Sequence, residues 1–310
     1  MKKLYFFVGL VLVVIIAFVI IYNTTQKINN KLSKIKIVTT LFPLYDFAKN
    51  IGGSKVEVSL LLPPGVEPHS FEPKPSDILK ISQADIFIYT GKFMEPWVED
   101  ILKSIPNKNL IVVDSSIGVK MIQENIQNTN NLKPSYDPHV WLDFGNDKII
   151  ISNISQAIIS HDKLSSSYYL KNSTDLQNKI SVLDLKYSSN LATCKSKEII
   201  YGGHYAFGYL ANRYEIKYAA AQGLSPNAEP SAQDLLKLVE QIRRDKIQYI
   251  FYEELSSPKI AETLAGETKT KMLLLNAAHN ITKQDFENNV SFLNIMEENL
   301  VNLKTGLNCN

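Results

Sequence analysis

The chain has 310 residues, 45% of them hydrophobic, so it can bury a full core and is long enough for two lobes. Its 33 basic and 31 acidic residues leave a formal charge of +2, which excludes the strongly basic surface typical of nucleic-acid-binding proteins. Glycine and proline, at 13 residues each, are too few for a collagen-like or low-complexity chain.

The first element is an uncharged apolar run, residues 4–22, directly after Lys2 and Lys3. As a helix it would be about 28 Å long, close to the ~30 Å hydrocarbon core of a bilayer. The basic end should stay inside, so the rest of the chain is expected to be exported. Residues 1–30 are therefore an N-terminal membrane anchor or a cleaved signal segment. The lack of a small-x-small cleavage site favours the anchor.

Strand and helix patterns alternate after this segment, which predicts a parallel α/β sheet in an N-terminal lobe at 35–163. We expect strands at 35–40, 56–62, 85–91 and 109–114, and helices at 43–53, 76–84, 95–105 and 146–160. Ser76 is expected to cap the second of these helices. The polar, Asn-rich stretch at 117–136 is expected to form a loop.

A helical pattern without proline or glycine covers 165–193, and such a helix would be about 43 Å long. This is longer than one lobe requires, so we interpret 164–194 as a connecting helix between two lobes. Cys194 and Cys309 are the two cysteines, and an exported chain could pair them or leave both as free thiols.

The alternation resumes in a C-terminal lobe at 195–310. We expect strands at 198–203, 215–220, 248–253 and 271–276, and helices at 206–214, 231–245, 258–268 and 286–303. The predicted fold class is therefore α/β, with two Rossmann-like lobes that contain parallel sheets and are joined by a long rigid helix.

Four of the five histidines lie just past or beside predicted strand ends, where open α/β sheets bind their ligands. They are His69, His139, His204 and His279. Each lobe contributes two, at similar places, so the four are expected to converge on a cleft between the lobes. Imidazole suits zinc, copper and nickel, whereas carboxylates suit manganese. The sequence therefore predicts a Zn2+ site, with His161, in a polar stretch, left on the surface.

Several stretches occur in a recognisable order: VTTLFPLYDFAKNIGG, LLPPGVEPHSFEPKPSDI, DPHVWLD, GGHYAFGYLANRY and FYEELSSPKIAETLAGET. On these motifs, over about residues 35–305, the chain resembles the ZnuA/TroA-like family, the cluster A-I solute-binding proteins of zinc and manganese ABC transporters. The resemblance implies metal held between two lobes, with ligands at His69, His139 and His204. A histidine at the third position is the pattern of zinc members. It also implies an ABC permease and ATPase as partners.

The chain departs from this family in two places. Many zinc members have a His-rich acidic loop, but the stretch MIQENIQNTNN here contains no histidine. Family members often supply Asp or Glu as the fourth ligand, whereas this chain has Asn276 and His279 in that region. We predict His279 as the fourth ligand, with water or Glu253 as the alternatives.

Other residues near the predicted ligands have candidate roles. Asp143 and Glu229 could orient a ligand imidazole through a hydrogen bond, or simply be solvated or capping residues. Four neighbouring aromatic residues are expected to pack in the core and to shield the site from water. They are Phe71, Trp141, Phe144 and Phe207.

Two other classes of protein remain open at this stage. Three histidines and a water form a catalytic zinc arrangement, with Glu67, Glu253 or Glu254 as a base, although the chain has no HExxH motif. A surface adhesin would also be exported, but it would not require the histidines to converge. We expect a monomeric, extracytoplasmic zinc-binding protein without enzyme activity or a nucleic-acid partner, with a manganese-binding homologue as the alternative for the metal.

Overall fold

The computed structural model describes residues 34–123, 135–226 and 229–310. The apolar run at 4–22 lies outside these ranges. Within them, no helix combines the length and the apolar composition that a bilayer crossing demands.

The N-terminal sheet is parallel, with the strand order β2-β1-β3-β4. Its strands are β1 (Ile35–Thr39), β2 (Val56–Leu60), β3 (Ile86–Tyr89) and β4 (Ile111–Asp114). Side chains alternate between the two faces, as the strand period requires. Ile37 packs in one buried cluster with α2 (Phe42–Gly52) and α5 (Phe144–His161), and Val38 packs in another with α3 (Pro75–Ser82) and α4 (Val98–Ser104). Helices therefore cover both faces of this sheet.

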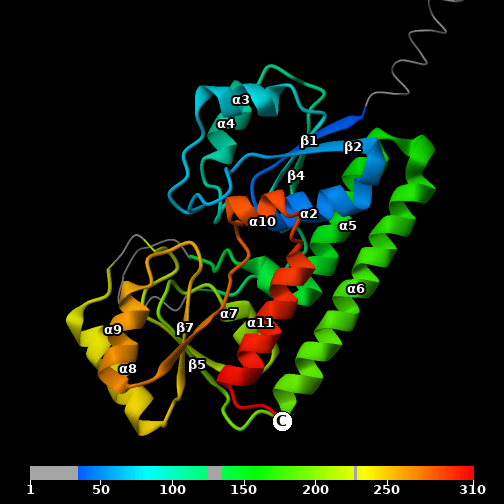
Figure 1. The fold of residues 1–310 in the computed structure, drawn as a ribbon. Helices are drawn as coiled ribbons and strands as arrows, with labels where there is room; N and C mark the ends of the chain where they lie inside the picture. Colours follow the sequence, from blue (N-terminus) through cyan, green and yellow to red (C-terminus); the bar gives the residue numbers. More distant parts are fainter. Residues whose placement is uncertain (1–33, 124–134, 227–228) are drawn as a thin grey trace, which may run out of the picture.

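The C-terminal sheet repeats this design, with the strand order β6-β5-β7-β8. Its strands are β5 (Glu198–Tyr201), β6 (Lys217–Ala220), β7 (Tyr249–Tyr252) and β8 (Lys271–Leu274). The helices of this part of the chain are α7 (Gly208–Arg213), α8 (Ala232–Arg244), α9 (Lys259–Thr268), α10 (Lys283–Glu287) and α11 (Phe292–Gly306). Of these, α10 lies beside α2 of the first lobe, where Phe286 meets Tyr45 (Figure 1). Three short 3-10 turns complete the described elements: η1 (Gly53–Lys55), η2 (Val140–Leu142) and η3 (Lys163–Ser165).

The long helix α6 (Ser166–Ala192) runs along one side of both lobes (Figure 1). One face of it is apolar at helical spacing and buried: Tyr169, Leu176, Ile180, Leu183, Tyr187 and Leu191. This face packs against α2 and α5 of the first lobe and against α11 of the second. The predicted fold class, two parallel α/β lobes joined by a long helix, is confirmed.

The two lobes share one buried core. Ile37 of the first sheet and Phe251 of the second belong to the same cluster, together with the inner face of α6. The ring of Phe47 in α2 meets that of Phe292 in α11 edge-on, with centroids 5.1 Å apart. The carboxylate of Asp46 accepts a hydrogen bond from the Phe292 backbone N–H at 3.2 Å. Opening the lobes widely would expose this apolar surface to water.

Two details of the predicted elements are wrong. The second helix begins at Pro75, so Ser76 lies inside its first turn. The Asp77 carboxylate instead accepts a hydrogen bond from the Lys74 backbone N–H. The helix predicted at 286–303 is split, because Asn289 adopts a φ of 56°, which interrupts α-helical geometry between α10 and α11. Ser291 then caps α11 by accepting from the Asn294 N–H.

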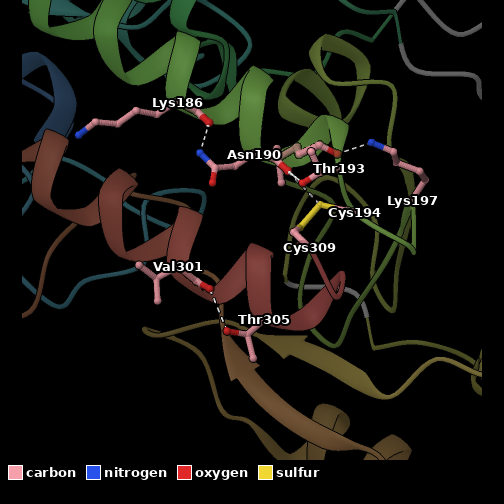
Figure 2. The surroundings of a disulfide bond; sticks show 9 residues. Lys186, Asn190, Thr193, Cys194, Lys197, Val301, Thr305 and Cys309 are labelled. Carbon is pink, nitrogen blue, oxygen red and sulfur yellow. Dashed lines mark hydrogen bonds between the residues drawn. A yellow bond between two sulfur atoms is a disulfide. The ribbon is translucent and has the colours of Figure 1, made fainter.

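Cys194 and Cys309 form a disulfide bond, which answers the question left open by the sequence (Figure 2). The bond joins Cys194, two residues past the end of α6, to the tail that follows α11. Backbone hydrogen bonds from Lys195 to Asn308 and from Ser196 to Leu307 lie beside it. The last helix is therefore tied to the end of the connecting helix by both covalent and hydrogen bonds.

Removing this bond should destabilise the protein. A Cys194→Ser/Cys309→Ser variant should lose about 2–5 kcal/mol of unfolding free energy, the usual effect of deleting a native disulfide across a long loop. Urea unfolding of the oxidised parent and of the variant measures the difference. The parent treated with a reductant should lose a similar amount. An unchanged midpoint after reduction would show that the bond contributes nothing.

Candidate metal centre

Each of the four predicted histidines lies in a loop beyond the carboxyl end of a strand. His69 follows β2, His139 precedes the η2 turn after β4, His204 follows β5, and His279 follows β8. Three of them are buried, and His69 is half-buried. His161 is the exposed last residue of α5, as predicted.

Three of these imidazoles meet at a point between the lobes. The Nε2 atom of His139 lies 3.2 Å from the Nε2 atom of His69 and 3.2 Å from that of His204. Their ring centroids are 5.1–5.2 Å apart in every pair. One nitrogen from each ring thus points at the other two.

Two of these rings each have their own carboxylate at Nδ1, the ring nitrogen that does not face the other imidazoles. Asp137 Oδ1 lies 2.8 Å from His139 Nδ1, and Glu253 Oε2 lies 2.9 Å from His204 Nδ1. An ionised carboxylate only accepts hydrogen bonds, so each ring must carry its proton on Nδ1. The Nε2 atom of each ring is then left with an unshared lone pair.

These lone pairs face each other across 3.2 Å, and two acceptors cannot hydrogen-bond to one another. A cation placed between the rings would accept the lone pairs of His139 and His204, and that of His69 as well. In a tetrahedral zinc site with Zn–N bonds of about 2.0–2.1 Å, neighbouring nitrogens lie about 3.3–3.4 Å apart. The chemistry and the spacing of the three nitrogens therefore fit a bound metal ion.

His279 lies beside this trio, in contact with its carboxylate. Its ring centroid is 5.6 Å from that of His204, and its Nε2 atom is 3.8 Å from Glu253 Oε1. A ligand atom from each of His204, Glu253 and His279 falls within 4.8 Å of the other two. Both His279 Nδ1 and Glu253 Oε1 are buried without a hydrogen-bond partner in the described part of the chain. Both alternatives for a fourth ligand, the imidazole and the carboxylate, are thus next to the site.

Asp143 and Glu229 take the second of the two roles that the sequence leaves open, capping and solvation. Asp143 caps α5 and pairs with Arg213 at 2.7 Å, and Glu229 is exposed. Asp137 and Glu253 hold the imidazoles instead. Asp137 had a local signal, since it precedes His139 by two residues and also accepts from the His139 backbone N–H at 3.0 Å. Glu253 had none, because it stands 49 residues from its partner.

The aromatic residues near the ligands divide into two groups. Trp141 lies against His139, with ring centroids 5.4 Å apart, and its Nε1–H donates to the Ala277 carbonyl of the other lobe at 2.8 Å. The other three pack on aromatic partners of the fold. They are Phe71 on Trp97, Phe144 on Tyr187 and Phe207 on Tyr201. Only the tryptophan of the four thus connects a predicted ligand to the opposite lobe.

Burial makes three of the imidazoles hard to protonate. It lowers the pKa of His69 to about 3, with a further contribution from the charges of His204 and His279. It lowers the pKa of His279 to about 4, against the opposing effect of Glu253, and it holds the pKa of His139 well below 6.5. Burial would raise the pKa of Glu253, but its hydrogen bond with His204 and the electrostatic influence of His204 and His279 lower it overall. Neutral imidazoles and an ionised carboxylate are the forms that bind metal.

Residues 37–306 match the family described as the periplasmic zinc-uptake complex component A, ZnuA. The chain is 35% identical to the high-affinity zinc uptake system protein ZnuA of Bacillus subtilis, over 92% of this chain and 91% of that protein. It is 31% identical to the zinc-binding protein AdcA of Streptococcus pyogenes, over 87% of this chain. That match spans only 56% of AdcA.

Solved structures show the same fold. The metal-dependent lipoprotein YcdH of Bacillus subtilis matches with a TM-score of 0.77 at 37% identity, over 88% of this chain and 99% of that chain. The Zn(II)-bound ZnuA-like domain of Streptococcus pneumoniae AdcA matches with a TM-score of 0.76 at 33% identity, over 89% and 99% of the two chains.

The depressed pKa values predict that metal binding tolerates mild acid. For each imidazole ligand with an ordinary pKa of 6.5, competition with protons would lower the metal affinity of the site about 30-fold at pH 5. His69 and His279, with pKa values of about 3 and about 4, stay neutral there. We therefore expect affinity to fall far less between pH 7.5 and pH 5 than about 30-fold for each of the four histidines, and His279 and His69 to add to the loss only near pH 4 and below.

Chelator competition titrations at pH 7.5, 6 and 5 measure this dependence. The sequence alone places the decline near the unperturbed imidazole pKa of about 6.5. A loss of several orders of magnitude by pH 5 would restore that expectation and contradict the effect of burial.

Proposed function

This chain belongs to the periplasmic zinc-uptake component A family, and we propose that it captures Zn2+ between its lobes and delivers it to an ABC importer. The observation that carries the proposal is the convergence of the Nε2 atoms of His69, His139 and His204, with spacings of 3.2 Å on both sides of the central ring. The related proteins, named for zinc uptake and zinc binding, support the choice of metal.

We assign the zinc ligands to His69, His139, His204 and His279. Four imidazoles complete a tetrahedral shell and leave no position for an activated water, which suits a carrier and disfavours a hydrolase. His279 is close enough to join the trio through a side-chain rotation, because one of its ring nitrogens already lies within 4.8 Å of a ring nitrogen of His204. On this assignment the zinc is cargo and the protein is not an enzyme.

Charge balance favours the same assignment. Four neutral imidazoles leave the +2 charge of the ion uncompensated, and two buried carboxylates lie just behind the rings. Asp137 backs His139 and Glu253 backs His204, so the ion and its surroundings would be neutral overall. Both carboxylates also raise the basicity of the imidazoles that they bind. Glu253 is therefore better placed to support the ligands than to replace one.

Delivery requires the protein to work outside the cytoplasm, next to a permease. We propose that residues 4–22 tether the chain to the membrane or direct its export, and that the exported part acts as a monomer. Its partners would be the permease and ATPase of an ABC importer. We also propose that the functional units are the lobes at 35–163 and 195–310, with 164–194 as the rigid connection.

Metal analysis of the protein purified without chelators tests the function directly. We expect one Zn2+ per chain, bound tightly enough to survive gel filtration, and no hydrolysis of ester or peptide substrates. Bound manganese in place of zinc would indicate a manganese carrier. Turnover that depends on the metal would indicate an enzyme. If the protein neither binds metal nor turns over a substrate, the surface adhesin is the remaining interpretation.

The His279→Ala variant tests the fourth ligand. Losing one imidazole, with water as its replacement, should weaken zinc binding by about 10- to 100-fold. His161→Ala is the matched control, since this exposed histidine lies at the end of α5, and it should bind like the parent. Competition with a chromogenic chelator gives both affinities. If His279→Ala equals the parent while His69→Ala does not, the site has three histidines and the catalytic alternative gains support.

A further inference from the structure

The loop that carries His279 belongs to the C-terminal sheet but is hydrogen-bonded to the opposite lobe. Its His279 carbonyl accepts from the Phe42 N–H at 3.3 Å, at the start of α2. Its Ile281 carbonyl accepts from the Gly65 N–H at 2.8 Å, in the loop that leads to His69. One backbone bond therefore joins the loops of two predicted ligands that lie 210 residues apart in the chain, and a second ties the His279 loop to α2.

One side chain in this loop reinforces the connection. Asn280 is completely buried and follows His279 directly. Its Nδ2 donates to the Pro63 carbonyl at 2.8 Å and to the Val66 carbonyl at 2.7 Å. Its Oδ1 accepts from the Ile281 N–H at 2.9 Å. Both donor hydrogens of the amide are thus committed to the other lobe, and the acceptor holds its own loop in shape.

The bonded segment at 63–66 is largely exposed, and its Val66 N–H donates to the Pro63 carbonyl at 3.1 Å. It lies past the end of β2, and it contains Gly65 at a φ of 85° and the exposed Val66. At the far end of the same loop, the Glu67 carboxylate accepts from the backbone N–H groups of His69 and Ser70 at 3.0 and 2.8 Å. Asn280 thus holds the start of the loop, and Glu67 shapes the turn that presents His69.

We propose that Asn280 is a positioning residue that clamps the His69 loop to the His279 loop, so that both imidazoles approach the ion as one unit and its release is slow. This inference rests on the proposed function, because it assumes that His69 binds the metal. His69 is the half-buried member of the set, whereas the other three histidines are buried. Without the clamp, this loop is free to leave first and to admit water.

The Asn280→Ala variant tests the clamp in the full-length protein. Loss of a group that supports a ligand typically costs 10- to 100-fold in metal affinity. We expect the zinc dissociation rate to rise by that factor in a stopped-flow chase with excess chelator, with little change in the association rate. The visible spectrum of the Co2+ form should lose intensity toward that of His69→Ala, because one imidazole is held less firmly.

A double variant separates positioning from general stability. If Asn280 acts through His69, adding Asn280→Ala to His69→Ala should change the dissociation rate little beyond His69→Ala alone. Independent effects that multiply would overturn the proposal. If His69→Ala itself leaves zinc binding unchanged, the assigned site is wrong, and that outcome is distinct from a failure of the clamp.

The control variant is Asn302→Ala. The Asn302 amide in α11 donates to the Leu274 carbonyl at 2.9 Å, a similar bond in the same lobe that does not cross to the other. It should lower the melting temperature of the metal-free protein without changing zinc release. If Asn302→Ala accelerates release as much as Asn280→Ala, the effect is general loosening and the proposal falls.

Hydrogen–deuterium exchange of the unmodified protein tests the clamp without any substitution, and so applies even if Asn280→Ala does not fold. The clamp predicts that 63–70 and 275–282 gain protection together, and to the same degree, as Zn2+ is added. A segment at 63–70 that still exchanges fast while 275–282 becomes protected would contradict it.

Discussion

The rest of this structure must overcome one repulsion, that between the imidazole lone pairs of the site. Asp137 and Glu253 place the protons of His139 and His204 on Nδ1, so their Nε2 atoms face each other as acceptors at 3.2 Å. Acceptors held this close oppose folding unless a cation joins them. The protein must therefore hold four loops in place by forces that originate elsewhere in the molecule.

Those forces come from a frame that spans both lobes. The inner face of α6 contributes to one core with both sheets, and the disulfide ties the end of α6 to the tail after α11. In α11, the Asn299 side chain bonds both the N–H and the carbonyl of Asn276, at the start of the His279 loop. The connecting helix and the last helix thus support the site from behind, which favours small loop movements over a wide hinge.

Much of the fold could be predicted from the sequence, because periodicity reports burial directly. Ile37 and Val38 alternate between the two faces of the first sheet, and each packs in a different buried cluster. The apolar residues of α6 recur at helical spacing and form its buried face. The prediction failed where one backbone conformation decided the outcome, as at Asn289, whose positive φ splits the last helix. Such a residue leaves no periodic signal.

The sequence by itself determined the kind of chemistry, since histidines that follow strands must gather at the carboxyl edges of parallel sheets. It also determined the two lobes and the long helix between them. Only the tertiary structure decided which distant groups support the histidines and their loops. Glu253 meets His204 across 49 residues and Asn280 reaches Pro63 across 217. Pairings of this range depend on how the two lobes pack, and no local pattern in the chain records that packing.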